Sequence, residues 1–285
     1  MSKPNLDPRL YAYRPDLADE RLRGKVNSTN FVSAEPAKIG INIADIYAKP
    51  DQQSPRLSQL LFGQNVLVFE DRNGFCWIQA VDDDYVGYTQ STNLQPVTNP
   101  ASHYVTANRT FAYKDADLKS PVSGVFSMGT EFIITDTLET RGIGYGITAE
   151  GDAIFMHHLS PVYERCRDYV VFAEKLIHTP YLWGGASAFG IDCSGLVQLA
   201  FKLVGRLVPR DSDLQSQEVG AVLTDRQNLR RGDLVFWQGH VAIAIDTVNV
   251  IHANGASMDV CIEPLQAVIE RFANGSGEPL CIRRP

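Results

Sequence analysis

Two stretches of the chain repeat one another at a nearly constant spacing, and this repeat restricts the fold of the first half. The residues that recur 66 positions later are Tyr47, Ser54, Pro55 and Gly63, which match Tyr113, Ser120, Pro121 and Gly129. At a spacing of 65, the residues that match are Leu94, Pro96 and Val97 with Leu159, Pro161 and Val162. A steady offset over about fifty residues indicates a duplicated structural unit.

Each copy is rich in short runs of β-branched and aromatic residues. The first contains "NVLVFED" and "FCWIQAV", and the second contains "TEFIITD" and "YGITAE". Turn residues separate these runs, so they predict short strands at close intervals, which is typical of small β-barrels. We predict one small barrel over residues 32–98 and another over 99–163. The polar residues 1–31 before them predict an extended arm, with a short helix near residues 16–22.

The sequence changes character from about Glu164. The segment "ERCRDYVVFAEKLIHTPY" predicts an amphipathic helix that ends before Pro180. A glycine-rich loop and a second helix, "GLVQLAFKLVG", follow, and Gly205 ends that helix. Three strand-like runs come next, and the tail from Leu265 contains a short helix and a final strand. Residues 164–285 therefore predict an α+β domain.

Composition excludes several classes of protein. The formal charge of −7 argues against a nucleic-acid partner, which usually requires a basic face. No apolar run is long enough to span a bilayer, and the first residues do not form a secretory signal. The five cysteines are irregularly spaced, which indicates reduced thiols and neither a disulfide framework nor a zinc site. We expect a cytoplasmic monomer without metal, cofactor or membrane contact.

Cys193 stands at the start of the second predicted helix, directly after Asp192. Unpaired backbone N–H groups and the helix dipole at such a position favour negative charge, so they suit a thiolate or an oxyanion. The alternative is that Cys193 is a small buried hydrophobic residue, because free cysteines are often buried.

A nucleophilic cysteine needs a base and a group that orients the base. His240 begins the run "HVAIAID", and its small neighbours Ala242 and Ala244 on the same face leave room for an opposing helix. If residue 242 lies opposite His252 on the next strand, the two histidines are diagonal neighbours within reach. A slip of one residue would separate them. Cys193, His240 and His252 thus form a candidate triad.

Four motifs in this order resemble the NlpC-type papain-like cysteine peptidases of bacterial cell-wall metabolism: "YLWGG…GIDCSGLVQLAF", "PRDSDLQ", "LRRGDLVFW…GHVAIAI" and "VIHANG". The resemblance covers residues 164–284. It implies that Cys193 is the nucleophile, that His240 is the general base and that His252 orients the base. The strand pattern of the two repeats resembles bacterial SH3-like domains over residues 32–97 and 100–162.

Two SH3-like units ahead of such a domain resemble the γ-D-glutamyl-L-diamino acid endopeptidases. The resemblance implies a murein peptide with a free N-terminal L-alanine as substrate, in cell-wall recycling. A carboxylate suits that ammonium group, so we expect Asp192 to bind it together with Tyr85, or alternatively Tyr88, of the first unit. Further candidates for substrate binding are Tyr181, Ser194, Arg210, Asp211 and Ser212. For Arg210 and Asp211 the alternative is that they shape their loop without binding the substrate.

Two other functions compete with this one. The chain could cleave intact peptidoglycan, with the SH3-like units as wall anchors, but this requires export. It could also be an inactive module that binds wall peptides, against which the intact Cys193, His240 and His252 argue. Trp183 and Trp237 are equally compatible with the core and with the walls of a cleft.

Overall fold

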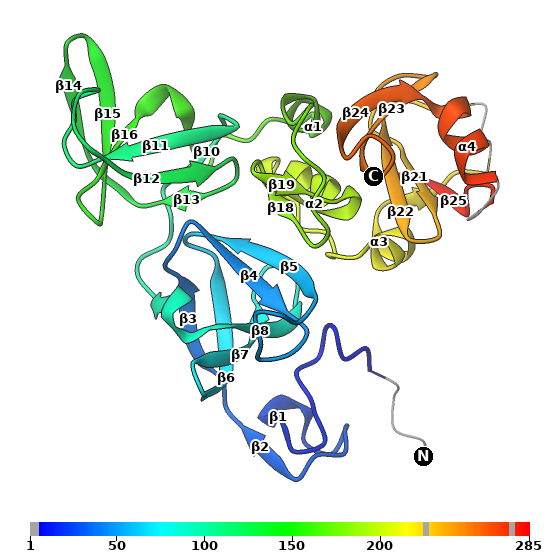
Figure 1. Ribbon diagram of the computed structural model, residues 1–285, viewed down its shortest axis with the longest axis horizontal. Coiled ribbons are helices and arrows are strands. Elements are labelled where there is room, and N and C mark those ends of the chain that lie inside the picture. Colours follow the sequence, from blue (N-terminus) through cyan, green and yellow to red (C-terminus); the bar gives the residue numbers. More distant parts are fainter. Residues whose placement is uncertain (1–5, 225–227, 274–276) are drawn as a thin grey trace. The chain divides into compact units, whose positions relative to one another are not determined.

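The computed structural model describes residues 6–224, 228–273 and 277–285 (Figure 1). Its contacts divide the chain into two compact units. The first contains residues 1–105, 110–126 and 130–161, and the second contains residues 106–109, 127–129 and 162–285. Both repeats therefore contribute to the first unit, and the domain boundaries predicted at residues 31, 98 and 163 stay predictions.

The first repeat folds into one antiparallel sheet of seven strands in the order β5-β4-β8-β7-β6-β3-β9. The strands are β3 (Glu35–Ile39), β4 (Ile43–Tyr47), β5 (Arg56–Leu61), β6 (Asn65–Arg72), β7 (Phe75–Ala80), β8 (Val86–Gln90) and β9 (Leu94–Pro96). The strand order is open, so the predicted small SH3-like unit is present without its strands closing into a barrel. β9 has only three residues, all paired with β3, and Pro96 offers no N–H for a further ladder.

The second repeat has the same strand order, with one break. Its strands form the orders β12-β11-β16-β15-β14 and β13-β10-β17. They are β10 (His103–Val105), β11 (Arg109–Tyr113), β12 (Val122–Ser127), β13 (Glu131–Phe132), β14 (Ile134–Thr140), β15 (Ile143–Thr148), β16 (Ala153–Phe155) and β17 (Leu159–Pro161). Gly63 and Gly129 both have left-handed backbone angles, with φ of 87° and 84°. The duplication predicted from the residue spacing is thus confirmed, whereas this copy too is open.

The arm contains two short strands, β1 (Leu17–Asp19) and β2 (Asn30–Val32), which pair in parallel. The helix predicted over residues 16–22 is reduced to a single 3₁₀ turn, η1 (Glu20–Leu22). The Asp19 carboxylate accepts the Arg21 N–H and caps this turn, while its own backbone belongs to β1. Residues 1–5 of the predicted arm lie outside the described residues.

The second unit has a six-stranded sheet with helices, which is the α+β layout that the sequence predicts (Figure 1). The sheet order is β20-β25-β21-β22-β23-β24, and a two-stranded sheet joins β18 and β19. The strands are β18 (Ala186–Ser187), β19 (Gly190–Ile191), β20 (Ala221–Val222), β21 (Leu234–Trp237), β22 (His240–Ala244), β23 (Asn249–Asn254), β24 (Asp259–Pro264) and β25 (Cys281–Arg284). The helices are α1 (Val170–Lys175), α2 (Cys193–Leu203), α3 (Ser212–Glu218) and α4 (Leu265–Ala273). Short 3₁₀ turns, η2 (Ser91–Asn93) and η3 (Met156–His158), precede β9 and β17 in the first unit.

Helices cover the strands that carry the two candidate histidines. Val268 of α4 packs in one apolar cluster with Ala242 and Ala244 of β22 and Val250 of β23. The small alanines therefore do leave room for a helix, and that helix is α4. The Cys193 helix, α2, contacts β22 and β23 as well. These contacts hold the start of α2 and the start of β22 in one packed body.

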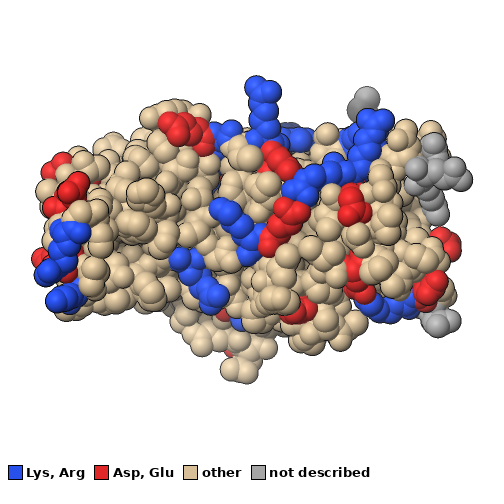
Figure 2. Space-filling view, turned by 90° about the horizontal axis from the view of Figure 1, so that it is seen from above, with Lys and Arg blue, Asp and Glu red and all other residues tan. Residues whose placement is uncertain are grey.

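Two observations concern the classes of protein that composition argues against, namely nucleic-acid-binding and membrane-spanning proteins. Figure 2 shows basic and acidic side chains interspersed on the face that it draws. Within the described ranges, no helix combines the length and the apolar character that crossing a bilayer requires.

Candidate active site

The start of α2 is fixed by the residue before it. Asp192 is the N-cap, with extended backbone angles, and its carboxylate accepts the backbone N–H of Gly195 at 2.7 Å. Cys193 is the first helical residue and is only 7% exposed. Backbone N–H groups of Val241 and Ser194 hydrogen-bond to its sulfur. Because Val241 follows His240 directly, the thiol lies beside the start of β22.

Burial determines the protonation states of Cys193 and His240. Burial raises the pKa of the Cys193 thiol to about 12, the charge of Asp192 raises it further, and the hydrogen bond from Val241 opposes the rise. The lowering expected from a helix start is therefore outweighed. Burial also lowers the pKa of His240 to about 3, with further lowering by His252 and Arg271. Both groups rest uncharged, so the proton must move as the sulfur attacks.

The hairpin of β22 and β23 has the register on which the predicted triad depends. Ile243 lies opposite Ile251 and Ala244 opposite Val250, which extends to residue 242 opposite His252. The Nε2 atom of His240 is 2.7 Å from the Nδ1 atom of His252. His240 is 7% exposed and His252 is fully buried, so this hydrogen bond is shielded from water.

The polar chain continues beyond the residues that the sequence singled out. His252 Nε2 lies 2.6 Å from Glu263 Oε1. Both oxygens of Glu263 accept from Arg271 of α4, one of them at 2.8 Å. The sequence carried one signal for Glu263, because the alternation in "DVCIEP" places it on one face with Cys261. That signal becomes useful only once the register of His252 opposite Cys261 is known.

His252, Cys261 and Glu263 bring a nitrogen, a sulfur and an oxygen within 4.8 Å of one another. Hydrogen bonds explain this cluster better than a metal ion does. Two ligands of a tetrahedral zinc ion would lie roughly 3.3 Å apart or more, whereas the His252 and Glu263 atoms are 2.6 Å apart. The Arg271 cation also occupies the carboxylate that an ion would need.

Asp192 forms a buried ion pair with Arg210, which is only 1% exposed. The guanidinium donates to both carboxylate oxygens, at 2.9 and 2.7 Å, and to Ser194 Oγ at 2.9 Å. The Asp192 carboxylate also accepts backbone N–H groups from Gly184 at 2.9 Å and from Gly195. Ser194 Oγ donates to it as well, at 3.3 Å, so five hydrogen bonds reach this one carboxylate. Arg210 thus ties the Asp192 carboxylate to the start of α2. The part of Asp192 and of Arg210 in binding the substrate stays a prediction.

The other substrate-binding candidates on this unit surround the start of α2. Burial raises the pKa of Tyr181 to about 12, and the charge of Asp192 and that of a Cys193 thiolate raise it further, so its hydroxyl stays protonated as a donor. Ser212 is the first residue of α3 and Asp211 is its N-cap. The Gln215 side chain ties α3 to α2, because its Nε2 donates to the Ser194 carbonyl at 3.0 Å.

Aromatic candidates divide between surface and core. Trp183, on the glycine-rich loop, is 69% exposed, whereas Trp237 is 2% exposed and packs in the core. Tyr85 is buried in the core cluster of the first repeat, and the Tyr88 hydroxyl accepts from Arg14 at 2.9 Å. Both tyrosines belong to the other compact unit, so their part in substrate binding stays a prediction.

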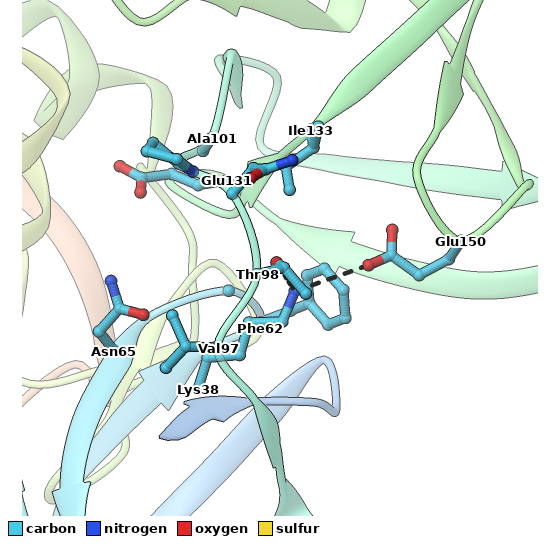
Figure 3. Close-up of a pocket in the computed structure, with 12 residues that line it drawn as sticks. Lys38, Phe62, Asn65, Val97, Thr98, Ala101, Glu131, Ile133 and Glu150 are labelled. Carbon is cyan, nitrogen blue, oxygen red and sulfur yellow. Dashed lines mark hydrogen bonds and ion pairs between the residues drawn. The ribbon is translucent and has the colours of Figure 1, made fainter. Parts of the chain in front are cut away.

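The first unit has a cavity of its own, of about 210 Å³. Figure 3 shows Lys38 pointing toward Glu150, with an N–O distance of 3.7 Å. Lys38 also donates to Thr98 at 2.7 Å. No candidate catalytic or substrate-binding residue lines this cavity.

Residues 178–271, which contain the three triad candidates, match the NlpC/P60 family, and residues 46–94 match the bacterial dipeptidyl-peptidase SH3 domain. The chain carries an NlpC/P60 domain. It is therefore a cysteine peptidase whose peptidase domain follows SH3-like units, as the resemblance implied.

Similar proteins match over most of the chain or over a part of it. Dipeptidyl-peptidase 6 of Lysinibacillus sphaericus is 26% identical over 244 residues, which covers 78% of this chain and 89% of that protein. A γ-D-glutamyl-L-lysine dipeptidyl-peptidase of Bacillus cereus is 38% identical over 116 residues, which covers 37% of this chain and 34% of that protein. The crystal structure of an NlpC/P60 family protein from Bacillus cereus shares the fold. Its TM-score is 0.73 and its identity 22%, over 88% of this chain and 99% of that one.

Proposed function

We propose that this peptidase releases the dipeptide L-Ala-γ-D-Glu from murein peptides that have a free N-terminus. It would cleave the bond between γ-D-Glu and an L-diamino acid. The observation that carries the proposal is the match to a dipeptidyl-peptidase over 89% of that protein's length, which spans both SH3-like and peptidase parts. The name of the Bacillus cereus relative supports the γ-D-glutamyl bond.

The described geometry supports a mechanism in two steps. The sulfur of Cys193 attacks the γ-carbonyl carbon of D-Glu while its proton passes to His240. The protonated His240 then gives this proton to the departing amine of the diamino acid, and the C–N bond breaks. Water, deprotonated by His240, hydrolyses the resulting thioester and frees the dipeptide and Cys193.

Groups near Cys193 can stabilise the oxyanion and contact the substrate. The backbone N–H groups at the start of α2 and the protonated hydroxyl of Tyr181 are suitable donors for the developing oxyanion. Trp183 offers an exposed aromatic face on the glycine-rich loop that precedes the nucleophile in the chain. We assign these two side chains to the walls of the substrate site.

Asp192 is buried and hydrogen-bonded within the protein, so a second carboxylate would strengthen recognition of the free amine. Asp211 directly follows Arg210, which contacts both Asp192 and Ser194. Asp211 is half-buried at the N-cap of α3. We propose Asp211 as a further ammonium-binding carboxylate beside Asp192.

A second candidate is cleavage within intact peptidoglycan. Murein DD-endopeptidase MepH of Escherichia coli favours it, at 41% identity over 81 residues, although the match covers only 28% of this chain and 30% of that protein. For the first candidate, the dipeptidyl-peptidase, we further propose that the enzyme is a monomer and acts in the cytoplasm on small murein peptides during cell-wall recycling.

One substrate panel separates the two candidates. Purified enzyme is incubated with L-Ala-γ-D-Glu-L-Lys, with the same tripeptide acetylated at its N-terminus, and with isolated sacculi. We expect rapid release of lysine from the free tripeptide alone. Cleavage of sacculi with no preference for the free amine would overturn the dipeptidyl-peptidase proposal and support the second candidate.

A further inference from the structure

Glu263 and Arg271 extend the hydrogen-bonded chain that begins at the candidate base. Glu263 lies at the end of β24, where it faces His252, and Arg271 reaches it from α4. Their side chains are 17% and 39% exposed, while His252 is fully buried. The partly exposed ion pair thus contacts the buried end of the His240–His252 hydrogen bond.

The protonation of Glu263 fixes which nitrogen of His252 carries a proton. Hydrogen bonds from Arg271 lower the pKa of Glu263 to about 2, and His252 lowers it further. Glu263 is therefore ionised at neutral pH, and an ionised carboxylate can only accept. Across the 2.6 Å contact, His252 must accordingly donate from Nε2.

The same reasoning then extends to His240. Burial lowers the pKa of His252, so the ring is neutral and carries one N–H. With its proton on Nε2, Nδ1 of His252 is an acceptor, and His240 must donate to it from Nε2 across 2.7 Å. His240 is neutral as well, so its Nδ1 is left bare and basic. Glu263 therefore determines which ring nitrogen carries the proton in His252 and, through His252, in His240.

We propose that Glu263, held by Arg271, is a positioning residue that sets the tautomers of His252 and His240 and leaves Nδ1 of His240 as the base for Cys193. The proposal rests on the roles of Cys193 and His240 in the proposed function.

Other groups around His252 do not supply this function. The Asn254 amide lies 3.4 Å from His252 Nε2, but it donates at shorter distances to Ser257 Oγ and Cys261 Sγ, 2.9 and 3.2 Å. The charges of Glu263 and Arg271 act in opposite directions on the pKa of His240. The effect of Glu263 therefore comes from its directed hydrogen bond more than from net charge.

Glu263→Gln tests the proposal, because an amide of nearly the same shape can donate as well as accept and no longer fixes the proton order. We expect ¹⁵N NMR of the histidine rings to show protonated Nε2 in both residues of the wild type, and a mixture of tautomers in the variant. We expect kcat/KM on L-Ala-γ-D-Glu-L-Lys to fall about 10- to 100-fold through kcat, with KM unchanged. Alkylation of Cys193 by iodoacetamide at pH 7, followed by mass spectrometry, should slow in parallel.

Glu270→Gln is the matched control, since Glu270 neighbours Arg271 on α4 and its carboxylate contacts only Gln266 among the contacts described for it. It should leave the tautomers, kcat/KM and alkylation unchanged. If Glu263→Gln fails to fold, Arg271→Met removes the group that holds Glu263 and should change the same readouts in the same direction.

Unchanged tautomers and an unchanged alkylation rate in the Glu263 variant would overturn the proposal. These two readouts need no substrate. If the wild type fails to cleave the tripeptide, the proposed function fails, while the NMR and alkylation results still decide the role of Glu263.

Discussion

Breaking the buried ion pair of Asp192 and Arg210 should cost much more unfolding free energy than breaking an ion pair on the surface. Arg210→Met removes four hydrogen bonds from a side chain that is 1% exposed: two to Asp192, one to Ser194 Oγ and one to the Gly185 carbonyl at 3.3 Å. It leaves the Asp192 carboxylate buried beside neutral donors only. Removing one partner of such a pair costs about 3–5 kcal/mol of unfolding free energy.

Urea unfolding followed by tryptophan fluorescence measures this cost, because Trp183 and Trp237 both belong to the unit that contains the pair. With a slope of about 2 kcal/mol per molar urea, the unfolding midpoint of that unit should fall by about 2 M. Arg231→Met is the control. Arg231 also pairs with two carboxylates, Asp168 and Glu174, but its side chain is 36% exposed, so the loss should stay below about 1 kcal/mol.

A double variant completes the test. In Asp192→Asn with Arg210→Met, no charge is left unpaired, so the loss should be clearly smaller than the sum of the two single losses. Equal midpoints for the Arg210 and Arg231 variants, or additive losses in the double variant, would refute the reasoning that this pair is a buried structural clamp.

Three further predictions concern the site. Gly195→Ala would place a Cβ 2.3 Å from the Gly185 carbonyl oxygen, so it should cost about 1–3 kcal/mol in the same urea assay, while Gly255→Ala, which meets no atom within 4 Å, should be tolerated. The pKa of Glu263 falls from 4.5 to about 2 on folding, so its stabilisation is present above pH 4.5 and is lost as the pH falls toward 2. The drop in urea midpoint between pH 5 and pH 3 should therefore be smaller in Glu263→Gln, and an equal drop would contradict this. Asp211→Asn should raise KM for the free tripeptide about tenfold or more, and an unchanged KM would remove Asp211 from amine recognition.

Local sequence signals predicted the elements of the peptidase domain well. Gly205, with a left-handed backbone, ends the second helix as expected, and the run that begins at His240 forms a strand in the assumed register with His252. These features depend on residues close in sequence, where turn residues and periodicity carry the information. The repeat spacing likewise predicted a duplicated unit, and the two copies do share one strand order apart from one break.

Contacts between distant segments could not be predicted in this way. Arg210 meets Asp192 across a separation of 18 residues, and nothing in "RDSDLQ" indicates that the arginine is buried. The sequence therefore did not predict that the Asp192 carboxylate takes part in a buried ion pair. Glu263 and Arg271 were missed for the same reason, since their link to His252 depends on the register of β24 and on the packing of α4.

The products released from the tetrapeptide L-Ala-γ-D-Glu-meso-diaminopimelate-D-Ala test the central claim most directly. Mass spectrometry should find L-Ala-γ-D-Glu as the sole N-terminal fragment with the wild type. It should find no fragment with Cys193→Ala, because loss of the nucleophile in a comparable triad costs about 10⁶-fold in kcat. Cleavage at another bond, or the same dipeptide released at a similar rate by Cys193→Ala, would contradict the claim.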